Sequence, residues 1–303
     1  MINNVVKILV ACNVCGCDLS KPLFLATDRL HGFDGEFQYV RCLDCGLIYM
    51  NPQIAPECTA QFYPDDYAPH QDGAATREKN TKWVLPKAIL ESLNPESKVL
   101  DVGCGNGDFL NKLRQYCHCS VYGLDFSRNA VDSARRQFGI EVFHGDFLAA
   151  PYKPQIFDLI SLWSCIEHLN NPAAAVQKAY SLCKPGGWIF IKTPNHKSLA
   201  AKCFKDKWYH LDCPRHLFIF SPSTIKMLLK KCGFEKVKIG YDLSSKGWLG
   251  SLQYVFYGDN YTDKTKNKIR RSSFAKMLVS PVSHTAAFLK YGDTMVVTAR
   301  KIK

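Results

Sequence analysis

The residues best suited to chemistry begin with a cluster of glycines after a short apolar run. Residues 99–102 read Val-Leu-Asp-Val, and three glycines follow at alternate positions: Gly103, Gly105 and Gly107. A strand that turns sharply into a helix leaves backbone N–H groups free at the helix start, and glycines let a ligand approach that backbone closely. The spacing is not the G-x-G-x-x-G of dinucleotide-binding turns, because residue 108 is an aspartate. The carboxylate of Asp101 suits a cationic ligand better than a pyrophosphate.

Two more carboxylates follow the next two predicted strands. Asp125 ends the run 121–125 and could accept hydrogen bonds from both hydroxyls of a ribose, and Phe126 comes directly after it. Asp146 and Phe147 follow the third strand. There the carboxylate could face the exocyclic amine of an adenine, and the aromatic ring could stack on the base. These residues predict a binding site for a nucleoside that carries positive charge.

Four cysteines near the N-terminus have the spacing of metal ligands. They form two C-x-x-C pairs, each followed by glycine and separated by 26 residues: Cys12 with Cys15, and Cys42 with Cys45. Two such turns complete a closed tetrahedral site for Zn²⁺, with Cys17 as an alternative to Cys15. Because thiolates fill every position, the predicted zinc has a role in folding rather than in chemistry. Disulfides or a redox pair are the alternative interpretation.

Three histidines lie in loops after the later strands, where an acceptor for a transferred group would sit. His168 follows Glu167, His196 follows an asparagine, and His216 lies in the run Cys-Pro-Arg-His. Each is a candidate general base or substrate contact, although a lone histidine is more often structural.

The chain pattern supplies the elements that must position these residues. Strands are predicted at 98–102, 120–124, 140–143, 157–163, 188–192, 235–242 and 294–299. Helices are predicted at 81–93, 108–116, 127–138, 172–183 and 222–232. Ser127, Asn171 and Ser221 are N-cap candidates, and Gly139 ends one helix. Strands separated regularly by helices predict a parallel sheet covered on both faces, that is, a doubly wound α/β fold.

We predict three parts along the chain. Residues 1–52 form the zinc ribbon, 53–95 a linker with a leading helix, and 96–303 the α/β domain. The stretch 244–292 is too long for a simple connection and mixes apolar with basic residues. We expect it to be a lid over the acceptor site, with contact to an anionic membrane or a lipid-linked acceptor as the alternative.

The motifs resemble those of class I S-adenosylmethionine-dependent methyltransferases. The resemblance rests on residues 99–107, Asp125, Gly145 with Asp146, and the run 182–188, and it covers about 96–243 and the last strand. It implies a Rossmann-like seven-stranded sheet whose last strand is antiparallel. It also implies S-adenosylmethionine as cofactor, with Asp101 and Gly103 near its methionine end. The zinc ribbon and the run 213–217 are similar to a bacterial subgroup often encoded in surface-polysaccharide and secondary-metabolite clusters.

Composition limits the classes of partner and compartment. The chain has 303 residues, 22% charged and 47% hydrophobic, with a net charge of +12. Such a basic balance favours an anionic partner, or it is only a well-solvated surface. Fourteen cysteines, most of them scattered in apolar stretches, fit a reducing cytoplasm better than a secreted disulfide scaffold. No stretch approaches the ~18 apolar residues of a membrane span.

The leading functional hypothesis is methylation of a small-molecule or glycan acceptor, most readily on a hydroxyl oxygen, with methylation on carbon as the alternative. An RNA methyltransferase that grips its substrate through the zinc ribbon is one alternative, disfavoured because acidic residues outnumber basic ones between residues 12 and 45. A catalytically silent S-adenosylmethionine-binding protein is the other. The sequence gives no indication of oligomeric state.

Overall fold

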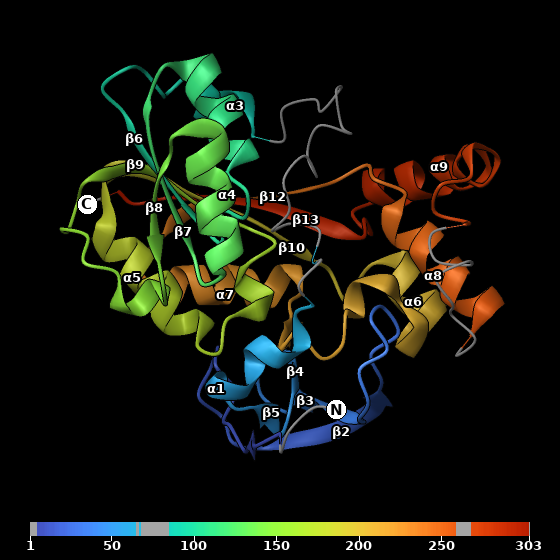
Figure 1. Cartoon of the computed structure of the whole chain (residues 1–303). Coiled ribbons are helices and arrows are strands. Elements are labelled where there is room, and N and C mark those ends of the chain that lie inside the picture. Colours follow the sequence, from blue (N-terminus) through green and yellow to red (C-terminus); the bar gives the residue numbers. More distant parts are fainter. Residues whose placement is uncertain (1–4, 65–66, 68–84, 259–267, 303) are drawn as a thin grey trace.

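The computed structural model describes residues 5–64, 67, 85–258 and 268–302 (Figure 1). Its strands are β1 (Lys7–Ile8), β2 (Ser20–Ala26), β3 (Phe37–Cys42), β4 (Ile48–Met50), β5 (Gln53–Ile54), β6 (Lys98–Val102), β7 (Ser120–Asp125), β8 (Glu141–His144), β9 (Phe157–Trp163), β10 (Cys183–Pro194), β11 (Phe218–Ile219), β12 (Glu235–Tyr241) and β13 (Thr294–Arg300). Its α-helices are α1 (Pro56–Thr59), α2 (Lys87–Leu90), α3 (Asp108–Cys117), α4 (Arg128–Phe138), α5 (Pro172–Leu182), α6 (Leu199–Phe204), α7 (Pro222–Lys231), α8 (Lys246–Tyr257) and α9 (Ser273–Phe288).

A seven-stranded sheet forms the centre of the molecule. Its strand order is β12-β13-β10-β9-β6-β7-β8. The strands β10, β9, β6, β7 and β8 are parallel, whereas β13 runs antiparallel to both of its neighbours, β10 and β12. The doubly wound sheet with an antiparallel last strand is therefore confirmed.

Side chains of alternating residues divide between the two faces of this sheet. Val99 belongs to a buried cluster with α2, α3 and α4, whereas Leu100 belongs to a larger cluster with α5 and α7. Figure 1 shows α3 and α4 on one side of the strands and α5 and α7 on the other. Since a parallel sheet is stable only when both faces are covered, these two clusters hold the sheet's carboxyl edge in place.

The predicted helix starts are confirmed where a capping side chain is present. Ser127 accepts from the N–H of Ala130, Asn171 caps α5, and Ser221 forms a full capping box with Thr224. Gly139 ends α4 in the left-handed conformation.

Two predicted boundaries were wrong. The helix expected at 81–93 is a single turn, Lys87–Leu90, that begins after Pro86, and residues 81–84 lie outside the described part of the chain. The strand expected at 188–192 spans Cys183–Pro194, with an irregularity in register between Cys183 and Trp188.

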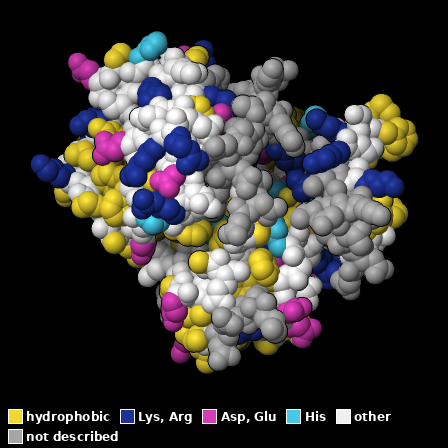
Figure 2. All heavy atoms as spheres, in the orientation of Figure 1, with side chains coloured by type: hydrophobic (Ala, Val, Ile, Leu, Met, Phe, Trp, Pro, Cys, Tyr) yellow, Lys and Arg dark blue, Asp and Glu magenta, His cyan; other side chains and the backbone are white. Residues whose placement is uncertain are grey.

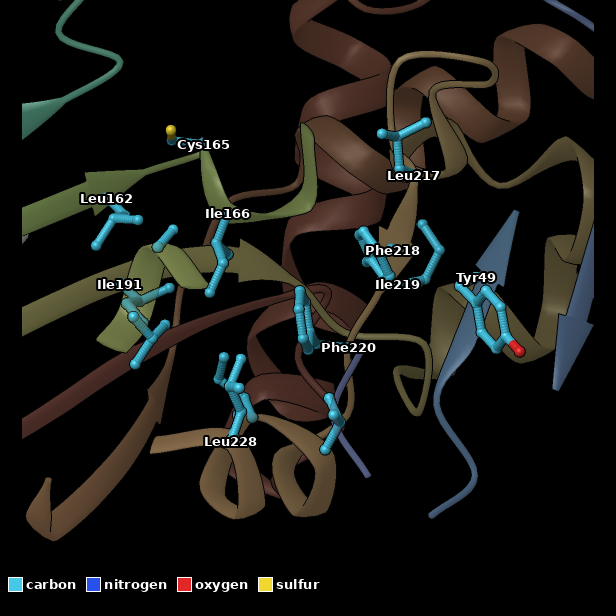
Figure 3. Packing of buried hydrophobic residues seen from close by; sticks show 14 of the residues in the cluster. Tyr49, Leu162, Cys165, Ile166, Ile191, Leu217, Phe218, Ile219, Phe220 and Leu228 are labelled. Carbon is cyan, nitrogen blue, oxygen red and sulfur yellow. The ribbon is translucent and has the colours of Figure 1, made fainter. Parts of the chain in front are cut away.

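The N-terminal residues form a second sheet, of order β11-β4-β3-β2. Its edge strand β11 comes from the loop after residue 210, so the small sheet is completed by the larger domain. The Tyr49 ring stacks on Phe218, with ring centroids 6.3 Å apart. Figure 3 shows apolar packing that runs from Leu162 and Ile191 of the central sheet to Tyr49. The two parts thus share one hydrophobic core.

The stretch 244–292 contains α8 and α9, which pack on each other beside α6 (Figure 1). Among the described residues, no helix has both the length and the apolar character needed to cross a bilayer.

Candidate active site

The glycine turn lies at the carboxyl edge of the central sheet, between β6 and α3. All three of its glycines have positive φ: Gly103 (74°), Gly105 (53°) and Gly107 (82°). The N–H groups of Gly103 and Cys104 both donate to the carbonyl of Leu124, which ties the turn to β7. A Cβ at residue 103 would lie 3.0 Å from the Cys165 sulfur. Glycine is therefore required here by both backbone conformation and close packing.

Asp101 lies beneath this turn and is 2% exposed. Its Oδ1 accepts a 2.6 Å hydrogen bond from the Ser161 hydroxyl. Burial raises the pKa of Asp101 to about 7. A cationic group bound above the turn would favour the ionised carboxylate, as the sequence predicts.

Asp125 ends β7 and lines the same edge. Its Oδ2 accepts from the Gly105 N–H at 2.9 Å, and its Oδ1 accepts from the Ser127 N–H at 2.9 Å. A carboxylate oxygen can accept more than one hydrogen bond. The turn and the carboxylate therefore position each other.

The other predicted cofactor residues differ in how far they are exposed. The Phe126 side chain is 48% exposed, and its ring meets Tyr63 edge-on at 5.2 Å. Asp146 is exposed and caps a short turn through the N–H of Leu148. Phe147 is only 2% exposed, so most of its ring faces the core rather than the cavity that it lines.

A cavity of about 1980 Å³ joins the glycine turn to the later loops. Pockets for one small ligand measure roughly 300–1,000 Å³, so this space can hold a nucleoside cofactor and an acceptor together. Asp125 lines the cavity beside the turn, and residues of β9, β10, α8 and α9 line it as well. His168 and His216 line it, but His196 is not among the lining residues. His196 instead lies near Arg41 of the N-terminal module.

The two lining histidines touch each other. Their ring centroids are 4.5 Å apart at 80°, an edge-to-face contact. His168 Nδ1 lies 2.9 Å from the Tyr63 hydroxyl. Burial lowers the pKa of His168 to about 3 and that of His216 to about 4, so both imidazoles are neutral at neutral pH.

The tautomer of His216 follows from its neighbours. Its Nδ1 lies 2.9 Å from the carbonyl oxygen of His210. Because a carbonyl only accepts, Nδ1 carries the proton and Nε2 keeps its lone pair. That Nε2 lies 3.7 Å from Asp212 Oδ2 and 4.0 Å from Glu167 Oε1. Nε2 is therefore the ring nitrogen of His216 that can accept a proton, and it lies beside two carboxyl groups.

Glu167 is an unusual member of this group. It is 1% exposed, and neither of its carboxyl oxygens has a hydrogen-bond partner among the described residues. Burial raises its pKa to about 8. One ligand atom each of Glu167, His168 and His216 lie within 4.8 Å of one another, a donor set that could also hold a divalent cation.

Glu167→Gln is expected to stabilise the protein at pH 8. The folded state keeps a proton on Glu167 up to about pH 8, whereas the unfolded chain releases it near the ordinary value of 4.5. Stability due to this group is therefore full below pH 4.5 and is lost as pH rises towards 8. Thermal unfolding should show the variant more stable by about 2–4 kcal/mol at pH 8, with the difference closing towards pH 5. The exposed Glu141→Gln is the control, and an equal shift at both pH values would contradict the assignment.

A buried arginine holds the His216 loop. Arg215 has no exposed side-chain surface, and its guanidinium contacts Asp28 at 2.7 and 2.9 Å and Asp212 at 2.7 Å. Although burial opposes it, the Arg215 charge holds the pKa of Asp212 well below its usual range. The Tyr39 hydroxyl donates to the His216 carbonyl at 2.7 Å. Asp28 and Tyr39 belong to the N-terminal module, which therefore forms part of the site's foundation.

Sequence reasoning did not find Tyr63, Asp212 or Asp28 as site residues. Tyr63 lies in a stretch read only as a linker. Asp212 stands one residue before the Cys-Pro-Arg-His run that was singled out, and that proximity was the available signal. Asp28 carries no local motif, because its partner is 187 residues away.

The cysteine cluster has the geometry of a tetrahedral metal site. The sulfurs of Cys12, Cys15, Cys42 and Cys45 all lie within 4.8 Å of one another. Two of the separations are 3.4 Å (Cys12 to Cys45) and 3.5 Å (Cys15 to Cys42). Four thiolates at about 2.3 Å from one zinc ion stand about 3.8 Å apart, so the set fits. Cys17 lies outside this group, and its thiol donates to the Leu19 carbonyl.

Comparison with known proteins agrees with the fold and the glycine turn. Residues 75–239 match the family model described as a methyltransferase domain, and the chain belongs to this family. Ubiquinone biosynthesis O-methyltransferase of Thiobacillus denitrificans is 33% identical over 124 residues, which are 39% of this chain and 51% of that protein. The Paraburkholderia phymatum enzyme of the same name is 32% identical over 120 residues, 38% of this chain and 50% of that protein. The chain thus spans about half the length of these relatives.

Solved structures show the same fold at low identity. Phosphoethanolamine N-methyltransferase 2 of Haemonchus contortus, complexed with S-adenosylhomocysteine, has a TM-score of 0.50 at 18% identity and covers 71% of this chain and 52% of that one. A protein from Galdieria sulphuraria described as a putative sarcosine dimethylglycine methyltransferase has a TM-score of 0.51 at 17% identity. The match covers 71% of this chain and 82% of that one.

Proposed function

We propose that this protein transfers a methyl group from S-adenosylmethionine to a hydroxyl of a small-molecule or glycan acceptor. The observation that carries the proposal is one cavity that joins the glycine turn and Asp125 to the paired imidazoles of His168 and His216. The O-methyltransferase names of the relatives support transfer to oxygen.

The cofactor would lie along the edge formed by β6, β7 and β8. Asp125 would accept from its ribose hydroxyls, and Gly103 with Asp101 would face its positively charged methionine end. S-adenosylmethionine supplies a methyl group already activated on a sulfonium, so the protein's main task is to position the acceptor.

His216 is the stronger candidate for the base that takes the acceptor's proton. Nε2 of His216 keeps its lone pair and lies near Asp212 and Glu167. Nδ1 of His168, in contrast, is already in contact with the Tyr63 hydroxyl. Asp212, 3.7 Å from Nε2, would stabilise the imidazolium that forms. We assign His168 and Tyr63 to positioning.

We further propose that the acceptor is anionic. The charged residues that 246–284 contribute to the described cavity wall are all basic: Lys246, Arg270 and Lys276. We assign the cysteine cluster to structural zinc, and this assignment supports membership of the zinc-ribbon subgroup that the sequence resembles.

Labelled methyl transfer tests the proposal. The protein is incubated with methyl-labelled S-adenosylmethionine and a metabolite extract, with and without added Mn²⁺, and the products are separated by anion exchange. Label is expected in a small anionic fraction. Label recovered in RNA, or no binding of S-adenosylmethionine by calorimetry, would contradict it.

Asp125→Asn is expected to weaken S-adenosylmethionine binding by about 10- to 100-fold. The amide loses the charge that strengthens hydrogen bonds to the ribose, each worth about 1.5–3 kcal/mol. Calorimetric Kd values measure the loss. Asp132→Asn, a partly exposed position on α4 whose carboxylate pairs with Arg128, is the matched control. Equal affinity in native and Asp125→Asn protein would remove Asp125 from the cofactor site.

A further inference from the structure

Helix α9 buries its small residues and exposes its bulky apolar ones, which is the reverse of an ordinary surface helix. Only three of its residues are buried, and all three are small: Ser283, Ala286 and Ala287. Its bulky apolar residues are exposed: Phe274 by 67%, Met277 by 63%, Leu278 by 58%, Val282 by 44% and Phe288 by 86%. Burial of bulky side chains drives folding, so an exposed set of this size indicates a surface that is covered by something else.

The exposed residues form one continuous face. At 100° per residue, positions 274, 277, 278, 282 and 288 fall within an arc of about 140°. The small buried residues occupy the opposite side, where α9 packs on α8. Leu289, just past the helix end and 57% exposed, extends the same face. We call these six residues the α9 apolar face.

The charged residues next to this face along the chain have a single sign. Described residues 268–292 include five basic residues and no acidic one: Lys268, Arg270, Arg271, Lys276 and Lys290. Figure 2 shows Lys and Arg side chains beside hydrophobic ones at the end of the molecule that α8 and α9 form. A helix with an apolar face, set in a segment whose charged residues are all basic, has the pattern of a helix that lies in the interface of an anionic bilayer.

We propose that the α9 apolar face docks on an anionic membrane surface. A second copy of the chain is the poorer occupant, because pairing this face with itself would bring like charges together. Since none of the described helices can span a bilayer, the binding is peripheral.

The docked face lies beside the cavity. Lys276, Ser280 and His284 repeat at intervals of four residues along one flank of α9, and all three line the cavity wall. The apolar face is the next flank of the same helix, so docking would hold the cavity close to lipid headgroups. Resting on the proposed function, we infer that the anionic acceptor is presented by the membrane, as a headgroup or a phosphate-linked glycan on lipid.

Vesicle binding tests docking without any need for turnover. The full chain is sedimented with phosphatidylcholine vesicles that contain either no phosphatidylglycerol or 30% of it. Binding is expected only to the anionic vesicles and should weaken at least tenfold in 0.5 M salt. Met277→Glu with Leu278→Glu should reduce it at least tenfold. Lys290→Glu alone should reduce it about fivefold or more.

The matched control places the same two charges on other exposed apolar positions. Leu25→Glu on β2 and Met227→Glu on α7 should leave vesicle binding within twofold, since these residues are 53% and 43% exposed elsewhere on the surface. Retained S-adenosylmethionine binding shows that each variant is folded.

Two results would overturn docking. One is equal sedimentation with neutral and anionic vesicles, or none with either. The other is a dimer in solution that Met277→Glu with Leu278→Glu dissociates, which would assign the face to a second copy. If vesicles bind but methyl label stays in the aqueous fraction rather than the lipid extract, the lipid-borne acceptor is wrong while methyl transfer itself stands.

Discussion

Asp28→Asn is expected to lower the free energy of unfolding by about 3 kcal/mol. Its carboxylate and that of Asp212 neutralise Arg215, whose side chain has no exposed surface. Removing one partner of a buried ion pair leaves an uncompensated charge and costs about 3–5 kcal/mol. The lower end of that range applies because Asp212 remains, and asparagine can still accept from the N–H of Leu30. Thermal melting should fall by about 6 °C for a chain of this size.

The same replacement should also reduce methyl transfer more than cofactor binding. Arg215 precedes His216, so loss of the Asp28 contact loosens the loop that holds the imidazole. We expect kcat to fall at least tenfold while the Kd for S-adenosylmethionine stays within about threefold.

Controls separate the ion pair from a general effect of charge on the N-terminal module. Asp34→Asn changes an exposed carboxylate of that module and should leave melting within about 1 °C. Combining Asp28→Asn with Arg215→Met measures the coupling energy between the two residues. If the two effects simply add, Asp28 does not act through Arg215.

How far the sequence predicted the fold depended on how local each signal was. Ser127, Asn171 and Ser221 mark helix starts through hydrogen bonds three residues away, and the glycine turn follows from the residues beside it. The helix predicted at 81–93 has no capping side chain, and only one helical turn of it is described.

Contacts across the chain lay beyond these local signals. The pairing of β11 with β4 joins segments about 170 residues apart. The sequence of a two-residue strand does not indicate which strand it pairs with. The Asp28–Arg215 ion pair has the same character. Sequence patterns therefore placed His168 and His216 in suitable loops, but only the fold brings them together and leaves His196 outside the cavity wall.

The α9 helix shows where apolar periodicity misleads. Phe274, Met277 and Leu278 have the spacing that is typical of a core-facing stripe. The structure buries the alanine side instead. Periodicity establishes that a helix has an apolar face, but the covering surface depends on which neighbour fits more closely.

His216→Asn is expected to reduce kcat by about 10²- to 10⁴-fold, the usual contribution of a general base. Asparagine places an amide N–H near the position of Nδ1, so it can keep the hydrogen bond to the His210 carbonyl and hold the loop. It lacks the Nε2 lone pair that faces Glu167 and Asp212. The chemical step should therefore be lost while the Kd for S-adenosylmethionine and the melting temperature change little.

The pH dependence of the native enzyme gives the same residue a second test. Because burial lowers the pKa of His216 to about 4, the imidazole is already unprotonated at pH 6, and kcat/KM should fall only as pH drops below about 5. An exposed histidine with the ordinary pKa of about 6.5 would instead give half activity near that value. His118→Gln, an exposed position at the end of α3, should leave the whole profile unchanged. If the His216→Asn enzyme keeps the native kcat, His216 is not the base.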